Sequence, residues 1–343
     1  MQPIPTGLIG YGTAGAVFHA PLIAAAPGLR LTAIASRRAD DIQRDFPEAR
    51  AYENAQSLLA DPAIDLVVIA TPNDTHAALA REALQAGKHV VVDKPFTLEA
   101  AEAEALIALA ERLDRRLTVF QNRRWDNDFL TVRRLVDDGR LGEVAYYEAH
   151  FDRFRPEIKA GWRETDVPGS GLLYDLGAHL IDQALVLFGM PRAITADVTR
   201  QRAAAKADDY FHLVLDYGTR RAVLHASVLV RDPGPRYLVH GDGGSFVKHG
   251  IDGQEAALRE GRRPGGEGWG DDDPALFGRF TDADGTVATI DTLPGRYTAF
   301  YDEVASAIRD GSALPVDARE ARDVIRVIEA AQISARERRT VVL

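Results

Sequence analysis

Three polar residues in two distant motifs have the chemistry of an acid–base catalyst. Lys94 stands at the end of a predicted buried strand, so its ammonium must reach water, a carboxylate or a ligand. Asp175 and His179 stand four residues apart where a helix is predicted to begin, and this spacing places them on one face. His179 can transfer a proton near neutral pH, and Asp175 can orient it or raise its pKa. The alternatives are a strand-end lysine that reaches solvent and a helix-capping Asp175 beside a core histidine.

A metal site is the competing interpretation of Asp175 and His179. It needs a third ligand, and no His, Glu or Cys cluster stands near them in the sequence. The sequence therefore predicts no metal.

A glycine pattern near the N-terminus predicts a dinucleotide site. Gly10, Gly12 and Gly15 form a complete G-x-G-x-x-G with Tyr11, Thr13 and Ala14, between a predicted strand and helix. Gly10 permits the tight turn, Gly12 lets a pyrophosphate approach the helix N-terminus, and Gly15 allows close packing of helix on strand. Alone, the pattern also fits an ordinary glycine turn.

The end of the second strand favours NADP(H), with NAD(H) as the alternative. An acidic residue about 20 positions after the glycines usually binds the ribose hydroxyls of NAD. This chain instead has Ser36, Arg37 and Arg38, and Asp40 comes too late. A hydroxyl and guanidinium groups can bind a 2′-phosphate, although the arginines can equally be solvated surface charges.

The segment after the third strand supplies further candidates. Thr71, Pro72, Asn73 and His76 lie at the carboxyl edge of the predicted sheet, where open sheets bind ligands. Asn73 and His76 can contact the ribose or nicotinamide side of the cofactor. A helix-capping role for Asn73 or Asp74 is equally consistent.

The predicted elements give an α/β protein with two domains. Strands at 7–10, 31–35, 65–70, 89–92 and 117–120 alternate with helices at 77–86 and 100–112, which predicts a doubly wound parallel sheet, the Rossmann fold. Beyond it, strands at 144–151, 210–217, 221–230 and 236–240 predict a large, open, mostly antiparallel sheet in an α+β domain, with helices at 129–137, 300–309 and 318–335. We expect domains at 1–122 and 123–343, with closing helices that can pack back on the first. The glycine-rich stretch 261–273 is expected to be a mobile loop.

Composition narrows the class of partner. A net charge of −10 disfavours nucleic acid and anionic membranes but allows a small anionic ligand in a local basic pocket. The chain has no cysteine, which suits a reducing compartment. There is no signal-peptide pattern and no apolar run of about 20 residues. We therefore expect a cytoplasmic protein with a small-molecule substrate.

The glycine turn, Asp93-Lys94-Pro95 and Asp175-Leu176-Gly177-Ala178-His179 resemble the Gfo/Idh/MocA oxidoreductases in order and spacing. That family usually has glutamate before the lysine, so the departure at Asp93 leaves this side chain's contact with the cofactor open. The resemblance implies that Asp93 and Lys94 lie beside the cofactor and that a cis peptide precedes Pro95. It also implies a homodimer or homotetramer formed through the C-terminal sheet.

Four longer stretches, at 122–131, 174–177, 209–213 and 250–255, are similar to the NADP-dependent scyllo-inositol dehydrogenases of this family. The resemblance implies hydride transfer between nicotinamide and a ring carbon of a cyclic polyol, scyllo-inositol or scyllo-inosose. It implies that Asn122 and Arg123 contact substrate hydroxyls, although they can equally form interdomain hydrogen bonds. Trp162 and Arg163 can cover the nicotinamide end.

Three other functions stay open at this point. The nearest is a dehydrogenase or reductase for another sugar or keto-sugar. The others are a redox-assisted glycosidase and a non-catalytic sugar sensor. The sensor is disfavoured because Lys94 and His179 are both present.

Overall fold

A computed structural model describes residues 2–343, which form two compact units. The first contains the chain up to Trp125 together with 253–269 and 296–322. The second contains 126–252, 270–295 and 323–343. The expected boundary near residue 122 stays a prediction about where independently folding domains meet.

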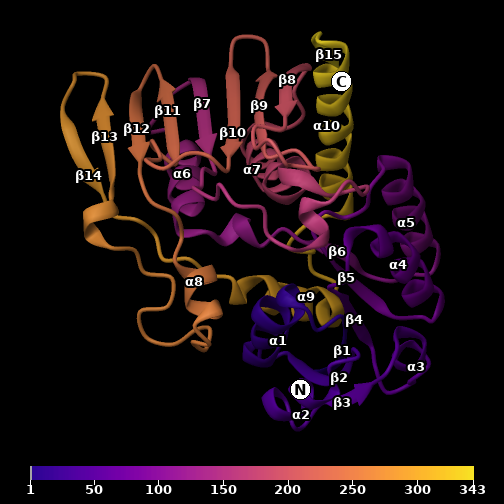
Figure 1. The fold of residues 1–343 in the computed structure, drawn as a ribbon. Helices are drawn as coiled ribbons and strands as arrows, with labels where there is room; N and C mark the ends of the chain where they lie inside the picture. The colour runs from indigo at the N-terminus through magenta and orange to yellow at the C-terminus, as the bar shows by residue number, and fades with distance from the viewer. Residues whose placement is uncertain (1) are drawn as a thin grey trace. The chain divides into compact units, whose positions relative to one another are not determined.

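The first unit is built on a six-stranded, fully parallel sheet with the order β3-β2-β1-β4-β5-β6 (Figure 1). This is the strand order of a dinucleotide-binding fold, so the predicted Rossmann domain is confirmed. Every residue of the central β4 is buried, which explains its continuous apolar character; β6 is equally buried, and its one polar residue, Thr118, donates a hydrogen bond to the carbonyl of Val316. The strands are β1 Ile4–Ile9, β2 Leu29–Ala35, β3 Arg50–Tyr52, β4 Leu66–Ile69, β5 His89–Asp93 and β6 Leu117–Phe120.

Helices connect these parallel strands. A π-helical turn at Ala14–His19 leads directly into α1, and α5 begins with a capping box between Glu99 and Glu102. The helices are α1 Ala20–Ala25, α2 Ala39–Asp45, α3 Ala55–Leu59, α4 His76–Gln85, α5 Ala100–Arg112, α8 Gln254–Arg259 and α9 Thr298–Asp310. The chain order reverses between β1 and β4, and their carboxyl ends flank the usual ligand crevice of such sheets.

The second unit is built on a nine-stranded sheet with the order β14-β13-β12-β11-β7-β10-β9-β8-β15 (Figure 1). The prediction of a large, mostly antiparallel sheet is confirmed, with one parallel pair, β7 and β10. The strands are β7 Val144–His150, β8 Ala193–Thr199, β9 Tyr210–Asp216, β10 Arg221–Ser227, β11 Tyr237–Gly241, β12 Gly244–Lys248, β13 Gly278–Asp282, β14 Val287–Ile290 and β15 Val341–Val342.

The two faces of this second sheet differ. In β9, Phe211, Leu213 and Leu215 are fully buried, whereas the alternate side chains are partly exposed. The buried face is covered by α6 Asn127–Asp137, α7 Ala178–Phe188 and the part of α10 Ala318–Glu337 that belongs to this unit. Side-chain hydrogen bonds tie α7 to β11 and α10 to β8. We call the opposite, partly exposed side the open face.

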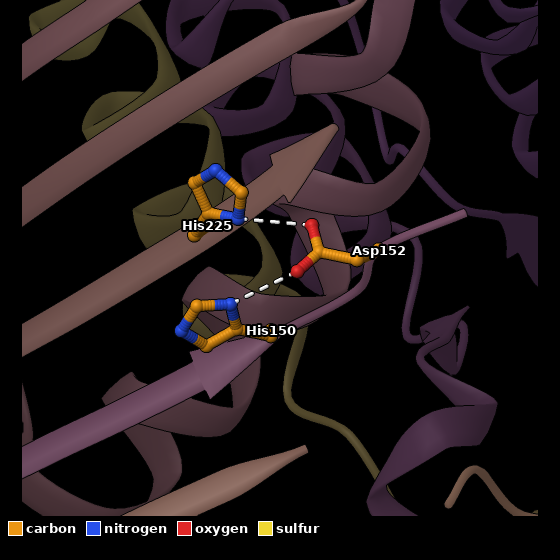
Figure 2. Close-up of side chains that lie close together, drawn as sticks. All are labelled: His150, Asp152 and His225. Atoms are coloured by element: carbon orange, nitrogen blue, oxygen red, sulfur yellow. Dashed lines mark hydrogen bonds and ion pairs between the residues drawn. The ribbon is translucent and has the colours of Figure 1, made fainter. Parts of the chain in front are cut away.

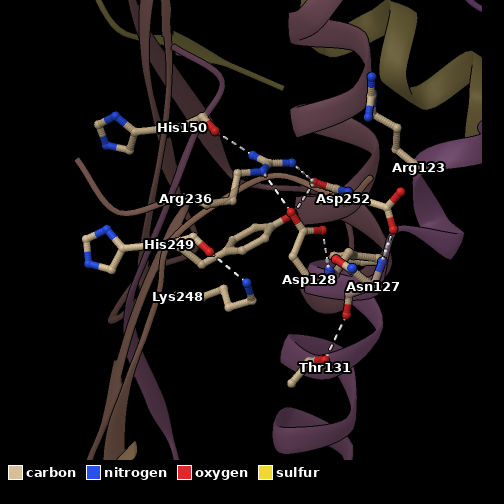
Figure 3. A network of polar contacts seen from close by, with 12 residues as sticks. Arg123, Asn127, Asp128, Thr131, His150, Arg236, Lys248, His249 and Asp252 are labelled. Carbon is tan, nitrogen blue, oxygen red and sulfur yellow. Dashed lines mark hydrogen bonds and ion pairs between the residues drawn. The ribbon is translucent and has the colours of Figure 1, made fainter. Parts of the chain in front are cut away.

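A buried polar network lies between α6 and this sheet (Figure 3). The Arg236 guanidinium lies 3.2 Å from Asp128 and donates a 2.6 Å hydrogen bond to the carbonyl of His150. Both charged side chains are at most 2% exposed. A buried charge is costly unless it is paired, so Asp128 stabilises the Arg236 guanidinium. The hydrogen bond from Arg236 to the His150 carbonyl then holds the end of β7 in place.

The stretch 261–273 was expected to be a mobile loop, and part of it is instead held by side-chain contacts. The stretch is irregular, but Trp269 is 8% exposed and its Nε1 donates to Gln254 at 3.0 Å. Trp269 is therefore anchored in the first unit, whereas 270–273 belong to the second, where Asp272 lies 2.9 Å from Lys248. Whether the remainder is mobile stays a prediction.

Candidate functional site

The parallel sheet brings the predicted cofactor residues to one edge. The glycine turn follows β1, Ser36–Arg38 follow β2, Thr71–Asn73 follow β4, Lys94 follows β5, and Asn122 and Arg123 follow β6. Because all six strands run in one direction, their carboxyl ends share an edge, and this edge is where such sheets bind ligands.

The glycine turn fits a dinucleotide. Gly10 has a φ of +99°, and a Cβ there would lie 2.4 Å from the carbonyl oxygen of Ala70. A Cβ on Gly15 would lie 2.0 Å from the carbonyl oxygen of Gly10. Around Gly12, by contrast, no atom of the described chain lies within 4 Å of the Cβ position. Two glycines are therefore required by packing, and the third leaves an open face beside the helix turn that Thr13 and Ala14 begin.

The residues after β2 are partly committed to one another. The Arg38 guanidinium donates 2.9 Å to the Tyr11 carbonyl and 2.7 Å to Asp41. Hydrogen bonds from Arg38 and Arg44 lower the pKa of Asp41, which is therefore ionised. Arg37 is exposed and forms no side-chain hydrogen bond or ion pair within residues 2–343. The Asp41 carboxylate thus offsets the charge of Arg38, and the Arg37 guanidinium is left available for a ligand.

A buried histidine supports the turn that carries Lys94. The Lys94–Pro95 peptide is cis, as the resemblance implies. The Asp93 carboxylate accepts the Lys94 amide at 2.8 Å and lies 3.6 Å from Nε2 of His19, which is fully buried. Burial alone would raise the pKa of Asp93, but the neighbouring His19 and Lys94 hold it below its usual value. The ionised Asp93 therefore fixes the backbone from which Lys94 extends.

His76 has a structural role in this geometry. Its Nδ1 lies 2.8 Å from the carbonyl oxygen of Pro95, and its Nε2 lies 3.0 Å from that of Thr71. Burial lowers the pKa of the fully buried ring. A neutral ring donates from only one nitrogen, so His76 donates to one of these carbonyls and faces the other, which links the two strand-end loops; its contact with the cofactor stays a prediction. The first residue before α4 is Thr75, so neither Asn73 nor Asp74 occupies its N-cap position.

Asn122 and Arg123 lie in a short 3₁₀ turn, Asn122–Trp125. Both are at most 5% exposed, and the Arg123 guanidinium forms a 2.5 Å ion pair with Glu255. Their predicted contacts with substrate stay a prediction.

In the second unit, Asp175 lies in a π-helical turn, Leu173–Gly177, that continues into α7 with His179. The first turn is therefore π-helical and not α-helical, and the expectation that both side chains share one face stays a prediction. π-Helical turns are rare and are frequent at functional sites. His179 is 5% exposed, whereas Asp175 is partly exposed and lies 3.5 Å from Nε of Arg163.

A cavity of about 210 Å³ in the second unit is lined by Asp175, Trp162 and Arg163. The Arg163 guanidinium stacks over the Trp162 ring at 4.5 Å. Other lining side chains are strongly polar, among them Arg153, Lys159, Arg202 and Asp208. The cavity can therefore bind a small polar molecule through charge-assisted hydrogen bonds.

Sequence reasoning missed three residues that shape the site. His19 gave no signal, because only the fold brings it to Asp93. Asp41 stands three residues after Arg38, a spacing at which side chains meet in a first helical turn. Asp208 accepts the Leu173 amide at 2.7 Å and so orders the turn that carries Asp175. The missed signal there was Gly171, whose φ of +86° and close approach to Asp208 require glycine.

The parallel sheet, the open glycine turn and the polar strand ends define a dinucleotide-binding protein of the Rossmann type. Residues 4–121 match the family model for the NAD-binding Rossmann fold of the GFO_IDH_MocA oxidoreductase family, and residues 133–343 match its C-terminal alpha/beta domain. The chain belongs to the Gfo/Idh/MocA family of oxidoreductases.

Three relatives illustrate this membership. The chain is 46% identical to the scyllo-inositol 2-dehydrogenase (NADP⁺) IolW of Bacillus subtilis, across 100% of this chain and 97% of that protein. It is 48% identical to the oxidoreductase YdgJ of Escherichia coli, with 99% of each chain covered. The solved structure of the Bacillus subtilis oxidoreductase YvaA has a TM-score of 0.97 at 45% identity, and covers 100% of this chain and 99% of that one. Within residues 2–343, no helix has the length and apolarity needed to span a bilayer.

Proposed function

We propose that this protein is an NADP-dependent dehydrogenase of a cyclic polyol, with scyllo-inositol and scyllo-inosose as the substrate pair. The observation that carries the proposal is the full-length similarity to a protein named for that reaction. The polar cavity around Asp175 supports it, because a carboxylate beside cationic side chains suits a molecule with several hydroxyls. A reductase for another keto-sugar is the nearest competing function.

NADP is favoured over NAD by the charge after β2. The Arg37 guanidinium is uncommitted, and the Ser36 hydroxyl stands next to it in the chain. A 2′-phosphate can take charge-assisted hydrogen bonds from both. The glycine turn with its open face at Gly12 would hold the pyrophosphate, and when bound the nicotinamide supplies the hydride chemistry.

The protein's own groups supply the proton chemistry in this proposal. His179 removes the proton of the reacting ring hydroxyl in the oxidising direction and returns it to the carbonyl oxygen during reduction. Lys94 donates a hydrogen bond to the same oxygen and stabilises the negative charge that develops there. Asp175 positions the substrate, with Arg163 as its ion-pair partner. Asp93 keeps the Lys94 backbone in place through its 2.8 Å hydrogen bond.

We also propose that the protein is cytoplasmic and assembles as a homodimer or homotetramer through the open face of its second sheet. The absence of cysteine fits the reducing compartment. The partly exposed side chains of β9 fit a surface that a second copy can cover.

The function is tested by NADPH and NADH oxidation across a panel of inososes and keto-sugars. We expect NADPH with scyllo-inosose to give the highest kcat/KM. Lys94→Met and His179→Ala should each lower kcat by several orders of magnitude while the Kd for NADPH stays nearly constant, because neither change touches the glycine turn. Lys206→Met and His249→Ala are matched controls at exposed residues outside the proposed site. Near-normal turnover in Lys94→Met and His179→Ala would rule out the catalytic assignment.

A further inference from the structure

Two histidines and an aspartate meet on the open face of the second sheet (Figure 2). Nδ1 of His150 lies 3.0 Å from one carboxylate oxygen of Asp152, and Nδ1 of His225 lies 2.9 Å from the other. All three ligand-type atoms lie within 4.8 Å of one another. We propose that His150, Asp152 and His225 bind one divalent transition-metal ion with the ligand preferences of zinc.

The distances suit such an ion. Zinc binds imidazole nitrogen and carboxylate oxygen at about 2.0–2.2 Å, so tetrahedral ligand atoms are separated by roughly 3.3 Å. The nitrogen–oxygen separations of 2.9 and 3.0 Å run to different oxygens of Asp152, and all three ligand atoms lie within 4.8 Å of one another, so the side chains need to adjust by about an ångström to surround one ion. Imidazole and carboxylate are also the ligand types that zinc, cobalt and nickel accept. Water can take the remaining coordination position.

The orientation of His225 distinguishes this arrangement from an ordinary hydrogen-bonded cluster. Its Nδ1 is buried and makes no aligned hydrogen bond within the described chain, although it lies 2.9 Å from Asp152. A histidine that simply donates to a carboxylate points its N–H along the line between the atoms. The Nδ1 of His225 is therefore not held by a hydrogen bond to Asp152, and in the neutral ring it can bind an ion beside the carboxylate.

A second carboxylate holds His150 in the orientation that a metal ligand needs. Nε2 of His150 lies 2.5 Å from Glu148, which in turn accepts a hydrogen bond from the Tyr146 hydroxyl. The side chains of Tyr146, Glu148 and His150 stand at alternate positions of β7 and share the open face. A carboxylate on the far nitrogen of a metal-bound histidine is a recurrent arrangement, because it fixes the tautomer that leaves the other nitrogen free for the ion.

The charges of the cluster favour a cation. Both carboxylate oxygens of Asp152 face an imidazole, and the carboxylate of Glu148 faces Nε2 of His150. Two carboxylates beside two imidazoles thus give the neutral-histidine form a net charge of two negative units, which a divalent ion balances.

The fold keeps the three ligands together. β7 and β10 pair in parallel with His150 opposite His225, and the amide of Ser227 donates 3.0 Å to Asp152. The His150 carbonyl is held by Arg236 from the buried network (Figure 3). The Asp152 side chain is 4% exposed, whereas His150 and His225 are 23% and 16% exposed in the single chain, on the same face that we propose a second copy covers.

The test is titration of the chelator-treated full-length protein with Co²⁺ and Zn²⁺. We expect one equivalent of Co²⁺ to bind, with the visible absorption of cobalt held by nitrogen and oxygen ligands, and Zn²⁺ to displace it. Asp152→Asn and His225→Gln should each weaken Co²⁺ binding by more than about 30-fold, and Glu148→Gln should weaken it by about 10-fold.

His240→Gln is the matched control, since His240 lies on neighbouring β11 and hydrogen-bonds Ser245 instead. It should bind Co²⁺ as the parent protein does. Circular dichroism and thermal melting identify any variant that fails to fold. The Co²⁺ affinities of the variants that do fold then test the proposal. The proposal is overturned if the parent protein binds no Co²⁺ at millimolar concentration, or if folded Asp152→Asn and His225→Gln bind it normally. No step of this experiment uses NADPH or turnover, so its result is separate from that of the proposed function.

Discussion

The glycine turn allows cofactor binding and fold stability to be separated by two neighbouring substitutions. Gly12→Ala adds a methyl group where no described atom lies within 4 Å, at a φ that does not require glycine. Such a substitution changes the free energy of unfolding little, and can raise it by up to about 1 kcal/mol, because it restricts the unfolded chain. The same methyl group occupies the face on which a pyrophosphate must approach. We expect the Kd for NADPH to rise by roughly 10- to 100-fold, equivalent to about 1.4–2.8 kcal/mol.

Gly15→Ala should have the opposite profile. Its Cβ would lie 2.0 Å from the carbonyl oxygen of Gly10 and 3.0 Å from the carbonyl carbon, so the helix must move away from β1 by more than 1 Å, on the order of the shift needed to restore van der Waals distance. Overpacking of this kind costs about 3 kcal/mol. This cost lowers the Tm by roughly 6–12 °C.

Thermal melting without cofactor and NADPH titration by fluorescence measure the two effects on the same samples. The reasoning fails if Gly12→Ala binds NADPH as tightly as the parent protein, because the open face would then not be the pyrophosphate seat. It also fails if Gly15→Ala melts at the parent temperature.

Two further predictions concern charge. Arg37→Met should raise the Kd for NADPH by about 10-fold or more and leave the Kd for NADH unchanged, since one charge-assisted hydrogen bond is worth about 1.5–3 kcal/mol. Fluorescence titration measures both constants. An equal loss of affinity for the two cofactors would contradict the role of Arg37 at a 2′-phosphate. Burial raises the pKa of Asp208 from 3.8 to about 6, so its ionisation destabilises the folded state as the pH rises from about 4 through 6. Asp208→Asn removes this cost and keeps a hydrogen-bond acceptor for Leu173, so urea unfolding should show it more stable than the parent by about 3 kcal/mol at pH 8 and nearly equal to it near pH 4. A constant difference across that range would show that Asp208 does not titrate as its burial implies.

Local signals were sufficient for much of the first unit. The predicted helix 100–112 and strand 117–120 have the observed bounds, because the helix is alanine-rich and capped and the strand is a short apolar run. The ends of long strands were less certain, since strands expected to reach 151 and 230 end at His150 and Ser227. Six strands were not predicted: β3, β8, β12, β13, β14 and β15. The strands β3, β14 and β15 are short or lie mostly at the surface, whereas β8, β12 and β13 were missed although they alternate in burial.

The sequence by itself determined the cofactor class and the family, since glycine spacing, the strand-end lysine and the Asp–His pair are all encoded within short segments. It could not determine which side chains are already committed to the protein. Arg38 is occupied by Asp41, and His76 faces two carbonyl groups, and both facts depend on backbone positions that only the folded chain defines. The same holds for His150 and His225, which are 75 positions apart (225 − 150) and become neighbours because β7 and β10 pair in parallel. Strand order and register decide such meetings, and hydrophobic periodicity, which indicates that a strand exists, carries no information about which strand lies beside it.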